Sequence, residues 1–327
     1  GVYLSAVAVP KLAPTVSGSF YTMALALAAA TLVIAYAVTK LRLGVGLFAI
    51  HDDEDAAEVM GVPTYGFKLV AFGLSCALAG VAGGIQALFV SYVTAPSTFN
   101  ITVPLTVVLM SVLGGSRHWA GPAIGAVAIT VLLYASTAAD QAIAGKAIVG
   151  AILVAAVLFL PDGILGRFAA RRREAIRGQT RVSEARPHPP AGRRRKPESD
   201  PEFLLVARGV RKAFRGVRAV DGVDIDVREG EILGVLGPNG SGKSTLINVI
   251  SGHYRADAGS ILFDGGEIAG LPAHRIARLG LARTYQIPRP FAHLTVRDNV
   301  ALTAMFGGER LAPDVARPAA DEWLAFT

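Results

Sequence analysis

Charged residues are scarce in this sequence. Only 17% of its 327 residues are Asp, Glu, Lys or Arg, whereas 52% are hydrophobic, and the mean hydropathy is +0.46. Soluble domains usually carry about 25% charged residues. So low a charge content excludes an ordinary soluble protein of two domains and indicates that part of the chain lies in a membrane.

Cysteine is nearly absent as well. Cys76 is the single cysteine, so the chain forms no internal disulfide, which excludes a disulfide scaffold and fits a cytosolic and membrane protein. A signal peptide is also missing, because the start, GVYLSAVAVPKLAP, has neither a basic n-region nor an initiator methionine. We therefore expect the chain to begin partway through a longer protein.

The net charge of +7 is concentrated in one segment. Residues 1–160 have a net charge of 0, residues 161–200 of +6, and residues 201–327 of +1. The segment 161–201 is rich in arginine and proline and poor in apolar residues, which predicts a basic, disordered linker. It has no interleaved aromatic residues, so we interpret its charge as attraction to membrane lipid headgroups and not as binding to nucleic acid.

Five apolar runs in the first 160 residues are candidates for membrane spans, which need about 20 residues each. The predicted spans are residues 20–39, 69–90, 98–113, 121–138 and 143–160. Small residues lie one turn apart inside two of them, Gly80 and Gly84 in one and Gly121 and Gly125 in the other. This spacing predicts close helix packing, with a path for a solute as the alternative.

The distribution of basic residues predicts the orientation of these spans. Lys40, Arg42 and Lys68 flank the first loop, Arg117 lies in the third, and five arginines follow the fifth span, whereas the second and fourth loops have none. Basic loops face the cytoplasm. We therefore place the first and third loops, and everything after residue 160, on the cytoplasmic side of a multi-pass protein in the cell (inner) membrane.

After residue 201 the pattern changes to short β-branched runs separated by glycines. The runs FLLVARGV, VDIDV, EILGVLG and GSILFDG are typical of strands. They predict a soluble α/β domain over residues 202–327.

The segment GPNGSGKST in this domain fits the phosphate-binding P-loop, because a predicted strand precedes it and a predicted helix, STLINVIS, follows it. Glycines let successive backbone N–H groups turn toward phosphates, and the helix N-terminus adds positive charge. Lys243 is expected to reach the β- and γ-phosphates of ATP, and the Ser244 hydroxyl to bind Mg²⁺. The predicted cofactor-binding residues are Gly237, Pro238, Asn239, Gly240, Ser241, Gly242, Lys243, Ser244 and Thr245.

The surrounding motifs KAFRGVRAVDGVDIDVREGEILGVLGPNGSGKST and GLARTYQIPRPFAHLTVRDNVAL resemble the ATP-binding subunits of ABC transporters, and most closely those of branched-chain amino acid importers. The resemblance implies that Phe214 stacks on the adenine. It also implies that Gln286 senses Mg²⁺ and contacts the permease. From the residues alone, Phe214 is as consistent with a core or hairpin aromatic, and Gln286 with an ordinary polar residue.

The apolar half of the chain also resembles the permeases of these importers. Its first cytoplasmic loop contains Asp55, Ala56, Ala57 and Gly61, which are similar to the Glu-Ala-Ala, three residues, Gly pattern of importer coupling loops, with Asp55 in place of the glutamate. A solvated turn is the alternative interpretation. The segment LGGSRHWAGPAIGA is similar to the same permeases.

The rest of the ATPase machinery expected from this resemblance is not found after Thr245. There is no Leu-Ser-Gly-Gly-Gln signature, no hydrophobic strand ending in Asp-Glu and no switch histidine. Asp321 and Glu322 follow a proline and alanines, which predicts an amphipathic helix and not that strand. The catalytic residues are therefore unknown, and we expect the chain as it stands to bind ATP weakly and hydrolyse it poorly.

These observations predict a multi-domain protein, a helical transmembrane bundle followed by an incomplete α/β P-loop NTPase domain, in which ATP drives import of branched-chain amino acids or related small polar solutes. The resemblance implies three partners: a second permease subunit, a partner ATP-binding subunit and an extracytoplasmic solute-binding protein. The alternatives are an exporter, a urea or amide transporter, and a non-catalytic nucleotide-binding membrane protein.

Overall fold

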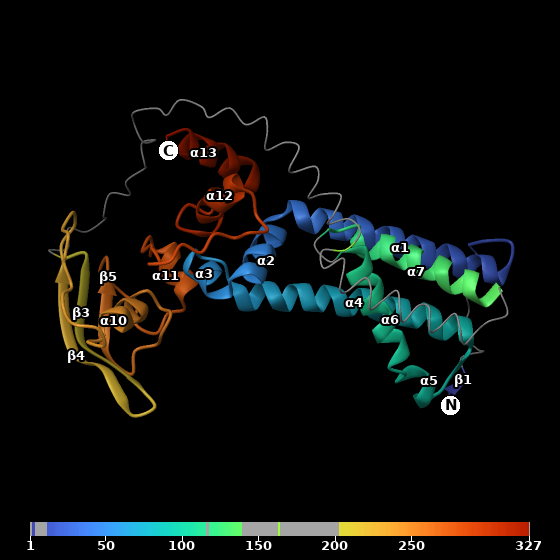
Figure 1. Cartoon of the computed structure of the whole chain (residues 1–327), viewed down its shortest axis with the longest axis horizontal. Coiled ribbons are helices and arrows are strands. Elements are labelled where there is room, and N and C mark those ends of the chain that lie inside the picture. Colours follow the sequence, from blue (N-terminus) through green and yellow to red (C-terminus); the bar gives the residue numbers. More distant parts are fainter. Residues whose placement is uncertain (1, 4–11, 116–117, 139–162, 164–202, 327) are drawn as a thin grey trace. The chain divides into compact units, whose positions relative to one another are not determined.

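The computed structural model describes residues 2–3, 12–115, 118–138, 163 and 203–326 (Figure 1). The described residues form two compact units. One contains residues 2–3, 12–40, 71–115, 118–138 and 163, and the other contains residues 41–70 and 203–326. The predicted linker, apart from residue 163, and the predicted span 143–160 lie outside the described residues, so the predicted domain boundaries stay predictions.

Two long apolar helices correspond to the first two predicted spans. Helix α1 comprises Val16–Lys40 and helix α4 comprises Thr64–Val90, with mean hydropathies of 2.0 and 1.7, and both are long and apolar enough to cross a membrane. The Thr15 hydroxyl accepts a hydrogen bond of 3.1 Å from the Gly18 amide and so caps the start of α1. Lys40 ends α1 with a cation, which suits the negative end of the helix dipole.

The third predicted span is a shorter helix than expected. Helix α6, Thr102–Gly114, begins four residues later than predicted, because residues Ala95–Thr98 form a separate short helix, α5. Pro104 fits the first turn of α6, where its missing N–H is not needed. With 13 residues, α6 is about 20 Å long, less than the hydrocarbon thickness of about 30 Å.

Helix α7, Gly121–Ala138, has the predicted bounds and packs closely on α6. A Cβ atom added to Gly125 would overlap the Met110 carbonyl oxygen, so this approach requires glycine. The predicted packing role is confirmed for Gly121 and Gly125, but no described atom lies within 4 Å of a Cβ added to Gly80 or Gly84.

A pair of two-residue strands also belongs to this unit. Strand β1, Val2–Tyr3, pairs antiparallel with β2, Tyr92–Val93.

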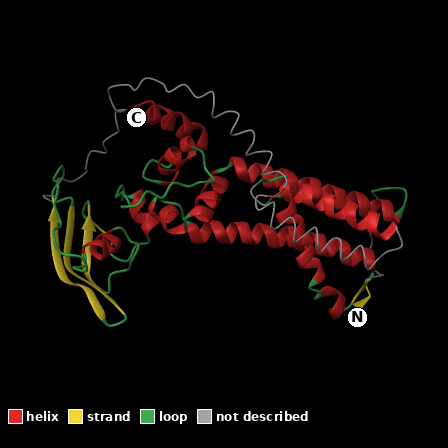
Figure 2. Cartoon of the chain, viewed as in Figure 1, coloured by secondary structure: helices red, strands yellow, loops and turns green. Residues whose placement is uncertain are grey.

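The second unit contains an antiparallel sheet of order β4-β3-β5-β6, drawn in yellow in Figure 2. Its strands are β3, Leu205–Phe214, β4, Val217–Val227, β5, Ala258–Phe263, and β6, Gly266–Glu267. Three of the four predicted strand segments are thereby confirmed. Helix α10, Lys243–Ile250, confirms the predicted helix after the P-loop and packs Leu246, Val249 and Ile250 into a core with Val210 and Ile261.

The fourth predicted strand, EILGVL, is wrong for this structure. Residues 231–236 adopt no strand, and the side chains of Ile232 and Leu236 are 97% and 96% exposed. A buried parallel strand is held by hydrogen bonds to neighbouring strands and by cover on both faces. No described strand forms backbone hydrogen bonds with these residues, so they are not part of a sheet despite their apolar sequence.

Five further helices belong to the second unit. They are α2, Arg42–Asp52, α3, Glu54–Val59, α11, Ala273–Arg278, α12, Val296–Phe306, and α13, Pro313–Phe326. The helix predicted around Asp321 and Glu322 is confirmed as α13, whose buried side chains are Ala316 and Ala320.

Candidate functional site

The P-loop joins the exposed segment before it to the N-terminus of α10. Gly240 and Gly242 have φ values of 84° and 89°, in the left-handed region that favours glycine. A Cβ atom on Gly242 would overlap the Ala219 carbonyl oxygen of β4, so close packing also selects glycine there. Gly242 is the N-cap of α10 and no side chain caps the helix, which leaves its first-turn N–H groups available to an anion.

Lys243 folds back over this loop. Its Nζ donates to the carbonyl oxygens of Gly237 and Pro238, both at 2.7 Å, and lies 3.3 Å from the Ser241 hydroxyl. These partners are neutral, so the ammonium group has no counter-ion among the described residues. The donor set of glycine amides, a helix N-terminus and one lysine therefore fits the phosphates of a nucleotide.

The two hydroxyl residues after the lysine lie in the first turn of α10. The Ser244 side chain is exposed and that of Thr245 is partly buried. The described residues contain no group of three or more His, Cys, Asp or Glu side chains that could hold a metal ion. An exposed hydroxyl on the phosphate loop is chemically suited to be one ligand of Mg²⁺, which prefers to keep several waters.

Phe214 lies at the end of β3, beside the turn to β4. Its ring is 38% exposed, meets the Tyr254 ring edge-on with centroids 5.0 Å apart, and lies 5.4 Å from the Lys212 Nζ. Phe214 is thus packed on one side against Tyr254 and remains partly exposed.

Gln286 lies at a bend in a segment of the ATPase-like region that has no regular secondary structure. Its side chain is exposed and forms no hydrogen bond among the described residues. Tyr285, just before it, packs against the core that holds α2 and α3, and Arg289, just after it, bonds to Asp53. Gln286 therefore sits between two residues that contact the predicted coupling loop.

The predicted coupling loop is built from α2 and α3, and its small residues are buried. Ala56 and Ala57 have no exposed surface and lie in one hydrophobic core with Leu302, Met305 and Phe306 of α12. A larger side chain at either alanine would push α3 away from α12. Both halves of the sequence contribute side chains to this core, although more than 240 residues separate Ala57 from Leu302.

Gly61 follows α3 and is fixed by its neighbours. Its φ is 98°, and an added Cβ would overlap the carbonyl oxygen of Phe306 at the end of α12. Arg278 of α11 donates to the Gly61 carbonyl at 3.2 Å. The glycine of the predicted motif thus permits both the turn and the close approach.

Acidic residues at the junction of α2 and α3 pair with basic residues of the region after Gln286. Arg289 Nη1 donates to Asp53 Oδ2 at 2.7 Å, and the Asp53 Oδ1 also accepts from the Ala56 amide at 2.9 Å, which caps α3. Burial alone would raise the pKa of Asp53, but these hydrogen bonds and the Arg289 charge outweigh it and hold the pKa below its ordinary value.

Two histidines make similar contacts. The His293 amide donates to Asp52 Oδ2 at 2.8 Å and its Nδ1 contacts the other carboxylate oxygen. His274 Nδ1 lies 3.3 Å from Glu58 Oε1. Asp55, the acidic residue of the predicted motif, is instead exposed and forms no ion pair among the described residues.

The described structure therefore places Ala56, Ala57 and Gly61 at one contact and leaves Asp55 outside it. Sequence reasoning missed Asp52, Asp53 and Glu58, which flank the motif. An acidic residue directly before a helix start is an N-cap candidate, and this pattern at Asp53 could have been recognised.

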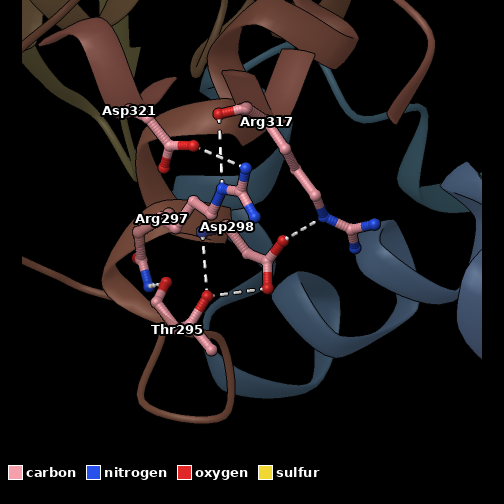
Figure 3. A network of polar contacts seen from close by, with 6 residues as sticks. Thr295, Arg297, Asp298, Arg317 and Asp321 are labelled. Atoms are coloured by element: carbon pink, nitrogen blue, oxygen red, sulfur yellow. Dashed lines mark hydrogen bonds and ion pairs between the residues drawn. The ribbon is translucent and has the colours of Figure 1, made fainter. Parts of the chain in front are cut away.

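A polar network fixes α13 on α12 (Figure 3). Thr295 caps α12 by accepting from the Asp298 amide at 3.0 Å, and Arg317 Nε donates to Asp298 Oδ1 at 2.8 Å. Arg297 Nη2 donates to Asp321 Oδ2 at 2.5 Å. Asp321 is thus a helix-surface ion-pair partner in this structure.

Both halves of the sequence match known families. Residues 4–157 match the permease component of the branched-chain amino acid transport system, and residues 220–326 match the ABC transporter family. Together the two matches cover most of the chain, with the permease family before the ABC transporter family. The chain combines a permease region and an ATPase region, and the ATPase region implies nucleotide binding.

Several curated ABC transporter proteins are similar to the ATPase region. A probable branched-chain amino acid transport ATP-binding protein LivG of Archaeoglobus fulgidus is 44% identical over 113 residues, which cover 35% of this chain and 44% of the relative. The high-affinity branched-chain amino acid transport ATP-binding protein BraF of Pseudomonas aeruginosa is 42% identical over 97 residues, which cover 30% and 38%. The ribose import ATP-binding protein RbsA 1 of Streptomyces avermitilis is 46% identical over 104 residues, which cover 32% and 20%.

The chain spans less than half the length of these relatives. A solved nucleotide-free ATP-binding cassette from an ABC transporter is 36% identical, with a TM-score of 0.30 and coverage of 35% of this chain and 44% of that one.

Proposed function

We propose that this ABC transporter chain contributes a permease and an ATP-binding portion to an importer of branched-chain amino acids or related small polar solutes. The observation that carries the proposal is the contact of α2 and α3, which belong to the permease region, with α11, α12 and the segment around Gln286, which belong to the ATPase region. A transporter driven by ATP needs such a contact between the part that binds nucleotide and the part that moves.

The P-loop is the proposed nucleotide site. When bound, ATP with Mg²⁺ supplies the γ-phosphate whose cleavage drives transport. Lys243 has no carboxylate partner among the described residues and is proposed to turn from its loop carbonyls to the phosphates. Ser244 and Gln286 are proposed to hold Mg²⁺, and the exposed part of Phe214 to stack on the adenine.

The α2–α3 loop is proposed to transmit the state of the nucleotide site to the helices. Gln286 is three residues from Arg289, which bonds to the N-cap of α3. A movement of this segment therefore reaches α3 directly through the ion pair and through the core around Ala56 and Ala57. Because α3 leads through Gly61 into α4, such a movement continues into an apolar helix long enough to span a membrane.

The solute and the direction of transport are proposals that rest on similarity. The permease match and the relatives LivG and BraF favour import of branched-chain amino acids. The ribose import relative favours a second candidate, a sugar importer, since the ATPase region alone resembles both. By the same similarity we propose a cell-membrane location and three partners, namely a second permease subunit, a second ATP-binding subunit and an extracytoplasmic solute-binding protein.

The proposed nucleotide site is tested by titrating the full chain in detergent with a fluorescent ATP analogue and Mg²⁺. We expect Lys243→Ala and Gly242→Ala to weaken binding at least about tenfold, since one removes a charge-assisted contact and the other forces a side chain into β4. Gly266→Ala is the matched control, because its added Cβ has only an ordinary contact with the Phe263 carbonyl at 3.5 Å. Unchanged affinity in both P-loop variants would refute the assignment.

A further inference from the structure

Basic side chains gather at the C-terminal end of α12, apart from the P-loop. The guanidinium group of Arg42, the first residue of α2, donates to the Met305 carbonyl and, from Nη1, to the Arg310 carbonyl at 3.4 Å. It also lies 5.2 Å over the Phe306 ring. Arg42 is thereby fixed beside the turn that contains Arg310.

Arg278 reaches the same place from α11. It donates to the Gly61 carbonyl, and the Gly61 backbone touches the end of α12 at Phe306. Arg42, Arg278 and Arg310 act on one another electrostatically, and Arg275 acts on Arg278 as well. We call Arg42, Arg278 and Arg310 the arginine cluster.

No carboxylate neutralises the arginine cluster in the described part of the chain. None of its three members forms an ion pair there, whereas Arg289, Arg297 and Arg317 of the same unit each do. The partners of Arg42 and Arg278 are neutral carbonyl oxygens. They accept hydrogen bonds from individual N–H groups but do not neutralise the positive charge of the guanidinium groups. Burial and, to a smaller extent, the charge of Arg310 lower the pKa of both Arg42 and Arg278.

Two donors of the cluster are buried without an acceptor. The Nε atoms of Arg42 and Arg278 have no hydrogen-bond partner and almost no exposed surface. An unsatisfied buried donor on a charged group is costly, and structures rarely keep one without a reason. A bound anion would balance the three positive charges. It would also supply an acceptor for the two unpaired N–H groups.

We propose that the arginine cluster is a binding site for a phosphate-type oxyanion, supplied by an anionic phospholipid headgroup or by free phosphate. Guanidinium groups match phosphate oxygens with paired N–H donors, and several of them around one anion give strong charge-assisted bonds. The chain position allows the lipid source, because Arg42 follows the end of α1 at Lys40 by two residues and α1 is long enough to span a membrane. The site is separate from the P-loop, and phosphate binding to it is measured without reference to transport.

The first experiment measures the thermal unfolding midpoint of the full chain against inorganic phosphate, with chloride at equal ionic strength as the reference. All variants carry Lys243→Ala, so that binding at the P-loop does not contribute. We expect phosphate to raise the midpoint, and Arg278→Gln and Arg310→Gln to weaken its apparent affinity about 10- to 100-fold.

The matched control is Arg215→Gln. Arg215 and Arg310 are both exposed arginines in loops, with left-handed φ values of 46° and 52°, so the two substitutions have similar effects on the backbone and on the net charge. If Arg215→Gln lowers the affinity as much as Arg310→Gln, the response is a general charge effect and the proposal is wrong. It is equally wrong if phosphate shifts the midpoint of Arg278→Gln and Arg310→Gln as much as that of their parent.

The second experiment distinguishes the two sources. The same proteins are placed in lipid nanodiscs of phosphatidylcholine alone or with phosphatidylglycerol, without phosphate in the buffer. The site binds a lipid headgroup if phosphatidylglycerol raises the unfolding midpoint of the parent and of Arg215→Gln but not that of Arg310→Gln. A response to inorganic phosphate alone, with the same pattern, assigns it to free phosphate, and no variant-dependent response to either probe overturns the proposal.

Discussion

Arg289 and Asp53 are joined by a hydrogen bond of 2.7 Å, and the same carboxylate caps helix α3. One side chain therefore starts the helix of the permease loop and also holds the ATPase segment that follows Gln286. The two roles use different oxygens of Asp53, so substitutions can separate them.

We predict that Asp53→Ala destabilises the protein more than Arg289→Gln does. Asp53→Ala removes the cap, at a cost of roughly 0.5–2 kcal/mol, together with the ion pair. Arg289→Gln removes only the ion pair, whose guanidinium group is half-exposed and therefore contributes little. Asp53→Asn keeps an acceptor for the Ala56 amide and is expected to behave like Arg289→Gln.

Unfolding by denaturant in detergent measures these three free energies. If Asp53→Asn is as unstable as Asp53→Ala, the charge and not the cap is decisive, and this division of roles fails.

We predict that acid weakens this contact through Asp53. Its pKa is lowered in the folded protein, so its contribution to stability is fully present above the ordinary aspartate pKa and is lost as the pH falls through the lowered folded value. Removing the Arg289 charge raises the folded pKa toward the ordinary one, so Arg289→Gln is expected to lose the contribution at higher pH than the parent.

The measurement is the unfolding free energy between about pH 5 and about pH 2. Asp53→Asn is the control, since it has no carboxyl group to titrate. The stability gap between parent and Asp53→Asn must close as the pH falls, and a constant gap would contradict the assignment.

Gly61→Ala is predicted to loosen the contact between α3 and α12. The substitution places a Cβ on a residue with φ of 98° and against the Phe306 carbonyl, which predicts a loss of about 1–3 kcal/mol. Gly66→Ala is the matched control five residues later. Gly66 lies inside α4, and no described atom beyond its own helical turn lies within 4 Å of the added Cβ, so alanine is expected to be neutral or to stabilise by up to about 1 kcal/mol.

Hydrogen exchange locates the effect. Faster exchange of the last amides of α12 in Gly61→Ala, with no change in Gly66→Ala, is the expected pattern. Equal exchange in both variants would mean that the Phe306 carbonyl moves aside without cost.

The sequence predicts the individual helices and turns of this chain better than the contacts between distant residues. Apolar runs without charges gave α1, α4 and α7, and the P-loop spacing gave the glycine turn and α10. These features depend on residues close in the chain. The pairing of Asp53 with Arg289 and of Asp52 with His293 depends on residues more than 230 positions apart, which one sequence does not bring together.

The predicted strand before the P-loop shows the same limit. EILGVL has the composition of a buried strand, but a strand forms only where another strand offers its backbone. The described strands of this unit pair only with one another, so none of them offers a free backbone edge that is used by EILGVL.

The exposed strand-like segment leads to the last prediction. Ile232 and Leu236 are almost fully exposed and unpaired, so we expect this chain to bind a hydrophobic fluorescent dye and to self-associate through this segment. Replacing both residues with threonine is predicted to reduce dye binding without lowering the unfolding midpoint, because no buried contact is lost. Val217→Thr is the control for the loss of an exposed apolar side chain, and a smaller effect on dye binding is expected because the backbone of Val217 in strand β4 is already paired. If the double variant instead lowers stability by several kcal/mol, as core truncations of this kind do, the two side chains are buried in solution and the segment is a strand after all.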